Sequence, residues 1–313
     1  MIQEITAANA IDYLKKRGQL SSGEDAVAEA LAWGVSNIVI RIDRRSGDDF
    51  VIKQSRKQLR TQAEWFCQLE RIWRELEVMQ ELQNLLPVGV VPRVLFEDRE
   101  NYLFAMEAID KDHKVWKAEL LDGIFDLSIA SRLGKYLGAI HRLSFDNQSL
   151  QERWGDWIIF DQLRIDPFYR FIVKAHPEIK DWVNDLIAEM ESNRICLVLA
   201  DFSPKNILIS GNQVHLVDFE TAHYGDPAFD LGFFLSHLML KAVYFGERGT
   251  DCIQLVECFW DQYLSEIAPL SESRNKEAEK MQQQELERRT IRHLAACMLS
   301  RVDGKSTVAA GSN

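Results

Sequence analysis

The sequence contains no long uninterrupted hydrophobic run. Its longest nearly apolar stretch, residues 231–240, is interrupted by Ser236 and His237 and falls well short of the roughly 20 residues that a membrane-crossing helix needs. The N-terminal residues also lack the basic start and apolar core of a secretory or transit signal. We therefore expect a cytoplasmic protein with no membrane partner.

Cysteine is scarce, and its spacing points to no special site. The five cysteines are an odd number, and no two of them form a C-x-x-C pair. Disulfide frameworks and zinc sites need paired or clustered ligands. His293 and Cys297 share one helix face, but further ligands are lacking nearby. The sequence therefore predicts neither a disulfide framework nor a zinc site.

Positive charge is also in deficit. The chain has 37 lysines and arginines against 48 aspartates and glutamates, which gives a formal net charge of −11. Sequence-independent binding to nucleic acid depends on basic side chains that neutralise phosphates, so we expect no nucleic-acid partner. The acidic balance mildly favours an amine-bearing small molecule over an anionic one. The remaining composition, 46% hydrophobic and 27% charged, is that of an ordinary globular protein.

The first 108 residues predict a β-rich lobe with one long helix. Apolar residues within 61–86 recur at spacings of three and four, which is typical of an amphipathic helix. Short apolar or alternating runs on either side of this helix predict strands. The expected strands are residues 28–33, 38–42, 48–53, 94–97 and 102–106, and a further helix is expected at 6–17. Polar residues 110–112 break the pattern, so we place a lobe boundary after residue 108.

Residues 109–313 predict a larger, mainly helical lobe. The expected helices are residues 129–143, 178–191, 229–242, 252–266 and 274–289, the last with a solvated charged face. One compact β region interrupts them at residues 195–199, 207–210 and 214–217, with a hairpin signal at Gly211-Asn212. The sequence therefore predicts an α+β fold of two lobes and leaves the oligomeric state open.

Three polar residues of the second lobe carry the chemistry. Asp201 is followed five positions later by Asn206, and Asp218 follows the predicted hairpin. Phosphoryl transfer needs a carboxylate near the attacking hydroxyl, and oxygen ligands that hold magnesium against the nucleotide phosphates. Each residue alone is typical of a turn or a strand end. In this order and spacing they predict Asp201 as base or orienter, and Asn206 and Asp218 as magnesium ligands.

The segments around these residues resemble the aminoglycoside phosphotransferase/choline kinase family, the small-molecule branch of the protein-kinase-like fold. The resemblance rests on D-F-E at 218–220 and G-D-P-A-F-D at 225–230, and extends more loosely over residues 33–240. It implies ATP- and Mg²⁺-dependent transfer of the γ-phosphate to a hydroxyl of a small molecule. The chain departs from the family at Leu199, where members usually have a histidine that supports the catalytic loop. This departure leaves a nucleotide-binding pseudokinase without phosphotransfer as the alternative.

The resemblance also implies nucleotide contacts in the first lobe. Lys53 ends an apolar strand, where its ammonium can reach the α- and β-phosphates. Glu75 on the long helix is expected to hold Lys53 in place through an ion pair. Glu77 lies on the same helix and is the alternative partner.

Two loops are expected to contact the nucleotide through their backbones. Gly34-Val35-Ser36-Asn37 lies between two predicted strands, where a small turn lets N–H groups and the side chains of Ser36 and Asn37 approach phosphates. A plain hairpin turn is the alternative interpretation. Residues 106–108 resemble the hinge whose backbone binds the adenine edge, which assigns Met106 and Ala108 to the nucleotide site.

The acceptor is expected to be small. Only eleven residues separate Asp218 from Asp230, too few for the long segment on which a protein kinase holds a peptide. We therefore expect a small hydroxylated acceptor, such as an aminoglycoside, an amino alcohol or a sugar-like molecule. Residues 154–176 mix aromatic and charged side chains, and either shape the acceptor pocket or pack as an amphipathic helix pair. Asp226 and Asp230 are expected to cap or anchor the next helix.

Overall fold

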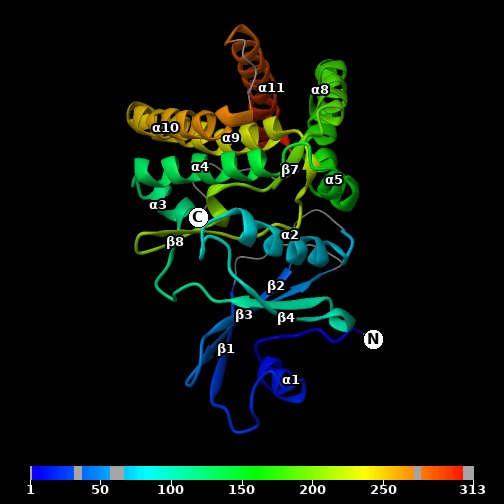
Figure 1. Cartoon of the computed structure of the whole chain (residues 1–313), viewed down its shortest axis with the longest axis vertical. Helices are drawn as coiled ribbons and strands as arrows, with labels where there is room; N and C mark the ends of the chain where they lie inside the picture. The colour runs from blue at the N-terminus through cyan, green and yellow to red at the C-terminus, as the bar shows by residue number, and fades with distance from the viewer. Residues whose placement is uncertain (1, 32–36, 57–66, 271–275, 306–313) are drawn as a thin grey trace. The chain divides into compact units, whose positions relative to one another are not determined.

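The computed structural model describes residues 2–31, 37–56, 67–270 and 276–305 (Figure 1). The chain divides into two compact units, Met1–His113 with His215–Glu220, and Lys114–Val214 with Thr221–Asn313. The first unit thus ends a few residues beyond the lobe boundary predicted after residue 108. It also includes the short segment His215–Glu220, which the sequence analysis had placed in the second lobe.

The first unit is built on a five-stranded antiparallel sheet (Figure 1). Its strands, in spatial order, are β1 (Ala26–Ala30), β2 (Asn37–Arg44), β3 (Phe50–Ser55), β5 (Leu103–Glu107) and β4 (Val94–Asp98). The central strand β3 is buried at every residue, and alternate side chains of a strand point to opposite faces. Ile52 therefore packs into the apolar core that also holds Tyr13 and Leu14 of α1 (Ala10–Lys16), while Lys53 points to the other face.

Helix α2 (Arg71–Leu85) contacts β3, β4 and β5. Its buried side chains include Ile72, Leu76 and Met79, which follow the predicted spacing of three and four. The helix begins at Arg71, later than predicted. Residues 67 and 68 have no regular structure, and residues 69 and 70 form a turn. Residues 61–66 of the predicted helix lie outside the described part of the chain. The short helix η1 (Arg99–Asn101) joins β4 to β5.

The second unit is mainly helical, as predicted. Its helices are α3 (Trp116–Leu121), α4 (Leu127–Leu143), α5 (Gln148–Trp154), α6 (Ile158–Phe160), the π-helix η2 (Asp161–Arg170), α7 (Phe171–Ala175), η3 (Pro177–Ile179), α8 (Lys180–Ser192), η4 (Pro204–Asn206), α9 (Pro227–Phe245), η5 (Gly246–Arg248), α10 (Gly249–Ile267), η6 (Ala268–Leu270) and α11 (Lys276–Asp303). Its short strands are β6 (Lys114–Val115), β7 (Cys196–Val198), β8 (Ile207–Ser210) and β10 (His223–Gly225), and β9 (Gln213–Leu216) carries the chain back into the first unit. Strand β7 pairs with β10, and β6 pairs with β8.

Close helix packing forms the core of the second unit. Helix α4 packs on α10, and α9 packs on α11. A side chain at Gly134 would collide with the backbone of α10, and one at Gly232 would collide with the backbone of α11. Small residues at these positions therefore let the helix pairs approach closely.

The apolar stretch 227–267 is long enough, by length and composition, to cross a membrane. In the structure it forms α9 and α10, which are separated by η5, and Gly246 has a positive φ of 56° at the break. In its most apolar 18-residue window, 61% of the residues are buried inside the protein. These apolar side chains are therefore used mostly in internal packing.

Residues 280–285, 287 and 288 of α11 are exposed, as predicted for its charged face, but the end of the predicted stretch is not. Arg289 is buried, as are Thr290 and His293. The guanidinium of Arg289 donates to the carboxylate of Asp226 at 3.0 Å. Periodicity could not show this because the buried partner lies 63 residues away in sequence.

Candidate active site

Lys53 is the centre of a buried charge cluster in the first unit. Its Nζ lies 2.7 Å from Glu75 Oε1 and 2.7 Å from Asp218 Oδ1. Strand β3 supplies the lysine and α2 supplies Glu75, so the ion pair expected from the sequence is present. Asp218 comes from the segment that returns at residue 215, and it reaches Lys53 across 165 residues of chain.

The charges of this cluster perturb one another. Burial disfavours the Lys53 ammonium, but the carboxylates of Asp218 and Glu75 outweigh burial and raise the pKa of Lys53 above its ordinary value. Burial raises the pKa of Glu75 to about 7, and Asp218 and Glu220 act in the same direction against the opposing effect of Lys53. The cluster therefore holds more negative charge than Lys53 neutralises.

The same cluster has the donor set of a divalent cation site. Carboxylate oxygens of Glu75, Asp218 and Glu220 lie within 4.8 Å of one another, and the buried Oε2 of Glu75 has no hydrogen-bond partner. Oxygen ligands of this kind suit Mg²⁺ or Ca²⁺. Asp218 was predicted as a ligand, whereas Glu220 was quoted only as part of the D-F-E motif. Its place as the third residue of that motif is the signal from which Glu220 could have been identified.

Backbone contacts hold Asp218 in place. The Leu216 N–H donates to the Val90 carbonyl at 2.7 Å, and His215 Nδ1 lies 2.6 Å from the Gly89 carbonyl. Asp218 itself has a φ of 73°, a left-handed conformation that aspartate adopts more readily than most residues. Such a conformation at a predicted metal ligand is typical of a functional site.

Asn37 belongs to a second buried network. Its amide donates to Glu220 Oε2 at 2.8 Å, and Arg71 Nε donates to the same oxygen at 2.9 Å. Arg71 also donates to the carbonyl of Arg56 at 2.7 Å. The Asn37 side chain therefore orients a carboxylate of the cation cluster, and its contact with phosphate stays a prediction. Ser36 lies outside the described residues.

The predicted hinge lies at the end of β5. Met106 pairs with Val51 on one side and Val94 on the other. The N–H of Ala108 donates to the Asp49 carbonyl at 3.3 Å, a long hydrogen bond. Adenine would therefore have to share or replace this bond in order to accept from Ala108, and both hinge assignments stay predictions.

Asp201 and Asn206 lie together in the second unit. Asn206 Nδ2 donates to Asp201 Oδ2 at 2.9 Å and to the Asp201 carbonyl at 3.0 Å. The other contacts of the carboxylate are cationic: Arg164 Nη2 lies 2.7 Å from Oδ1, and Lys205 Nζ lies 2.8 Å from Oδ2. Asp201 is therefore held by three side chains, of which Arg164 and Lys205 were not singled out from the sequence.

The backbone before Asp201 is anchored by Asp230. The N–H groups of Leu199 and Ala200 each donate to the Asp230 carboxylate at 2.7 Å. His141 Nε2 lies 3.3 Å from Asp230 and its Nδ1 lies 2.9 Å from Tyr263 Oη. Asp230 thus has the structural role expected of it, and His141 contacts it. The loop is anchored although Leu199 replaces the usual histidine.

Ala200 has a positive φ of 57°, which is strained for a residue with a side chain. Arg164 Nε donates to the Ala200 carbonyl at 2.5 Å, and Thr221 Oγ1 donates to the Leu199 carbonyl at 3.1 Å. These bonds stabilise the strained turn. Arg164 comes from η2, so part of the aromatic and charged region 154–176 supports the Asp201 loop.

Asp226 is a structural residue, as expected. Its carboxylate caps α9 by accepting from the Ala228 N–H at 3.0 Å, and it pairs with Arg289. Burial raises the pKa of Asp226 above its ordinary value, and Arg289 opposes this. His223 is also buried and stacks on Phe160, with ring centroids 3.9 Å apart.

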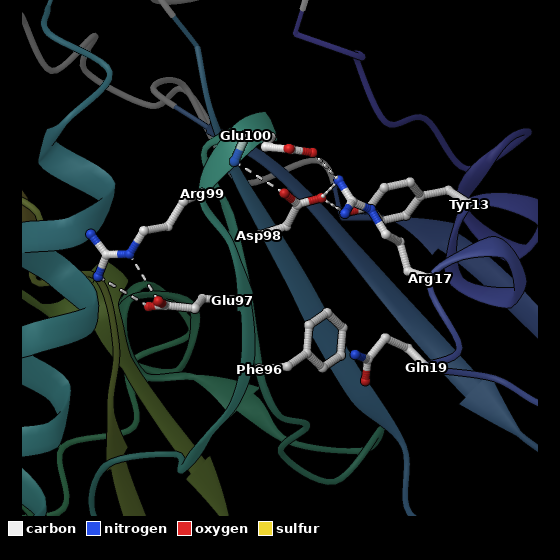
Figure 2. A pocket seen from close by; sticks show the side chains of 8 residues that line it. All are labelled: Tyr13, Arg17, Gln19, Phe96, Glu97, Asp98, Arg99 and Glu100. Carbon is white, nitrogen blue, oxygen red and sulfur yellow. Dashed lines mark hydrogen bonds and ion pairs between the residues drawn. The ribbon is translucent and has the colours of Figure 1, made fainter.

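A separate hollow of about 340 Å³ lies between α1 and the β4 end of the first unit (Figure 2). Its charged residues pair with one another: Arg17 contacts Asp98 at 2.7 Å, and Arg99 contacts Glu97 at 2.9 Å. Tyr13 Oη also donates to Asp98 at 2.5 Å. This hollow contains none of the predicted site residues.

Comparison with known proteins agrees with this geometry. Residues 27–250 match the family described as "Phosphotransferase enzyme family". A methylthioribose kinase from Yersinia pestis (strain Pestoides F) is 26% identical over 264 residues, which cover 75% of this chain and 64% of that enzyme. The chain thus spans less than two thirds of the length of this relative.

Solved structures share the fold. A choline kinase from Cryptosporidium parvum Iowa II has a TM-score of 0.60 at 14% identity, over 94% of this chain and 88% of that one. The amicoumacin kinase hAmiN, whose structure holds AMP-PNP, Ca²⁺ and Ami, has a TM-score of 0.51 at 16% identity, over 90% and 93% of the two chains. The fold is therefore the α+β protein-kinase-like fold. With the family match covering most of its length, the chain belongs to the phosphotransferase enzyme family.

Proposed function

We propose that the protein transfers the γ-phosphate of ATP, with Mg²⁺, to a hydroxyl of a small molecule. The observation that carries this proposal is the buried contact of Lys53 with both Glu75 and Asp218 at 2.7 Å. A lysine held by a helix glutamate, beside an aspartate suited to a metal, is how kinases of this fold prepare a nucleotide site.

Each residue of the cluster has a separate role in this proposal. Lys53 offers its ammonium to the α- and β-phosphates, and Glu75 keeps it oriented. Asp218 is the proposed ligand of Mg²⁺ in this cluster, and the position of Glu220 beside it makes Glu220 a further candidate. Asn206 belongs to the second unit and stays the second predicted ligand. Bound Mg²⁺ would neutralise phosphate charge and polarise the bond to the leaving group.

Asp201 acts on the acceptor. In the transfer, the acceptor oxygen forms a bond to the γ-phosphorus, the bond from that phosphorus to the β-phosphate oxygen breaks, and the hydroxyl proton leaves toward Asp201. The carboxylate must be oriented for this step, and Arg164 and Asn206 hold one oxygen each. The anchored loop favours a working kinase over the pseudokinase alternative, because the usual histidine is not needed to fix its backbone.

The class of acceptor is supported by the relatives. The enzyme from Yersinia pestis is named for methylthioribose, a sugar derivative, and the solved structures are named for choline and amicoumacin. All three names denote small molecules, and the short segment between Asp218 and Asp230 has no room for a peptide platform. We therefore propose a small hydroxylated acceptor.

The test is phosphate transfer from Mg²⁺-ATP across sugars, amino alcohols, aminoglycosides and hydroxy acids. The parent should transfer phosphate to at least one of them, and the nearly isosteric Asp201→Asn should reduce single-turnover transfer by roughly 10² to 10⁴. Its affinity for Mg²⁺-ATP should stay within a few-fold of the parent's. Full activity in Asp201→Asn would exclude the assigned role, and ATP binding without transfer to any acceptor would establish the pseudokinase.

A further inference from the structure

A group of basic side chains lies close to Asp201 in the second unit. We call it the cationic cluster. Its members are Lys117, Lys205, His237, Lys241 and Arg301. They come from α3, the Asp201 loop, α9 and the end of α11. Their convergence from four distant parts of the sequence is not expected of a solvated charged surface.

Two members of the cluster, His237 and Lys241, lie on one face of α9. Phe233, His237 and Lys241 follow one another at a spacing of four, so they lie along one face of the helix. Across from them, Arg301 Nη2 lies 3.4 Å from His237 Nε2, and its guanidinium carbon lies 5.6 Å from the Phe233 ring centroid. The cluster therefore has an aromatic end and a cationic end.

The aromatic end connects the cluster to Asp201. The guanidinium of Arg164 lies over the same Phe233 ring at 5.4 Å and over Phe168 at 5.7 Å, and Arg301 lies over Phe168 at 4.9 Å. Arg164 also pairs with Asp201. Lys205 pairs with the same carboxylate, and its side chain is 43% exposed, so the cluster reaches solvent at Lys205.

Lys241 is the buried lysine of the cluster. It is 8% exposed, and its Nζ has one weak polar contact, the His237 carbonyl at 3.4 Å. In the described part of the chain, no carboxylate lies within ion-pair distance of it. A buried ammonium without a carboxylate is costly, so its retention indicates a partner that the chain does not supply.

Burial and neighbouring positive charge both lower the pKa values of these groups. Burial and then Lys117 lower the pKa of Lys241 to about 8. Burial, followed by Arg301 and Lys241, also lowers the pKa of His237 well below its ordinary value. Burial lowers the pKa of Arg301 to about 10, although Asp201 opposes this. An anion beside Lys241 and His237 would relieve the repulsion on these two groups.

We infer that the acceptor carries a carboxylate or phosphate group, which the cationic cluster binds while the acceptor hydroxyl is presented to Asp201. This inference rests on the proposed function and narrows its substrate class. It reverses the preference for an amine-bearing acceptor drawn from the overall charge of −11. Net charge is summed over the whole surface, whereas an acceptor responds to the few groups around its own site.

Binding without nucleotide is the first test. Calorimetry at constant ionic strength should show glycerate or glycerol 3-phosphate binding at least about tenfold more tightly than glycerol. The two anions distinguish a carboxylate site from a phosphate site. Lys241→Met keeps the stem and removes the charge, so the preference for the anion should disappear. Lys135→Met changes an exposed lysine of α4 and should leave the preference for the anion unchanged. Equal binding in the parent and Lys241→Met, or no preference for an anion, would overturn the inference.

Turnover is the second test and separates the inference from the proposed function. Hydroxy acids or phosphate monoesters should be better acceptors than matched neutral alcohols. Lys241→Met should raise the KM of the anionic acceptor about tenfold or more, with the KM of ATP within twofold. A raised KM of ATP instead would assign the cluster to the nucleotide phosphates and overturn the acceptor assignment. Asp201-dependent transfer that prefers neutral or amine acceptors would also overturn it but leave the kinase proposal standing. Absence of all transfer would reject the kinase proposal, while the binding test would still decide whether an anion site exists.

Discussion

Arg164 Nη2 lies 2.7 Å from Asp201 Oδ1, and Nε of the same guanidinium donates to the carbonyl of Ala200 at 2.5 Å. One side chain thus holds both the carboxylate and the strained peptide that precedes it. The planar guanidinium can do this because its donors lie in a fixed fork, whereas a lysine offers a single ammonium. Arg164 is therefore a positioning residue for Asp201.

Arg164→Lys should lower kcat at least about tenfold while changing the KM of ATP by no more than a few-fold. The reason is that lysine keeps the charge but cannot bond the carboxylate and the Ala200 carbonyl in the same geometry. Steady-state kinetics over a range of acceptor and ATP concentrations gives both constants.

The control is Arg194→Lys, which changes another arginine that donates to a carbonyl and lies over Trp157. Its kcat should equal the parent's. A second check is Arg164→Ala with added guanidinium ion, which should recover part of the lost kcat. Loss of folding cooperativity in Arg164→Lys, or no recovery by guanidinium, would show that Arg164 is only structural.

Lys53→Met should bind Mg²⁺-ATP more weakly or turn it over at least about tenfold more slowly. Methionine keeps most of the stem volume but removes the ammonium that Glu75 and Asp218 hold. The fold should survive, because the substitution removes a buried charge but leaves its two carboxylates to titrate or bind metal. Nucleotide titration and circular dichroism on one preparation test both statements. Turnover equal to the parent's would contradict the assigned role.

Asp218→Ala should weaken the coupling between Mg²⁺ and ATP binding. In the parent, ATP should bind more tightly with Mg²⁺ than without it, because a cation between carboxylate and phosphate oxygens stabilises both. Calorimetry of ATP binding with and without Mg²⁺ measures this difference. Glu29→Ala, which removes an exposed carboxylate of β1, should retain the full coupling. Unchanged coupling in Asp218→Ala would remove Asp218 from the metal site.

Lys241 should make stability depend on pH in a defined direction. Its pKa is about 8 in the folded protein, against an ordinary value of 10.5. Between these values the unfolded chain binds more protons at this site, so the free energy of unfolding should rise with pH. Below about pH 8 the buried ammonium destabilises the fold by at most about 3 kcal/mol.

Lys241→Met should therefore have a larger free energy of unfolding than the parent at pH 7, and the difference should shrink as the pH approaches 10.5. Urea unfolding of both proteins at pH 7, 8, 9 and 10 measures the difference directly. Lys135→Met should follow the parent at every pH. A constant difference between parent and Lys241→Met would show that Lys241 titrates normally.

Local patterns predicted most of the secondary structure because their signals lie within a few residues. The strands around 38–42, 48–53 and 102–106 appear in the sheet, and the helix expected at 252–266 is α10. The prediction of a solvated face for 274–289 missed one residue at its end, since Arg289 pairs with Asp226 inside the second unit. Charge along one helix face does not show which face a distant helix will cover.

The sequence alone determined the order and spacing of Asp201, Asn206 and Asp218, and the strand position of Lys53. These are local facts, since a loop of fixed length and an alternating strand place such residues without reference to the rest of the chain. The tertiary structure decided between Glu75 and its alternative Glu77 as the partner of Lys53. It alone decided that Arg164 holds Asp201, and that α3, α9 and α11 bring basic side chains together near Asp201. Contacts between residues tens or hundreds of positions apart depend on how helices and strands pack, and no pattern of nearby residues encodes that packing directly.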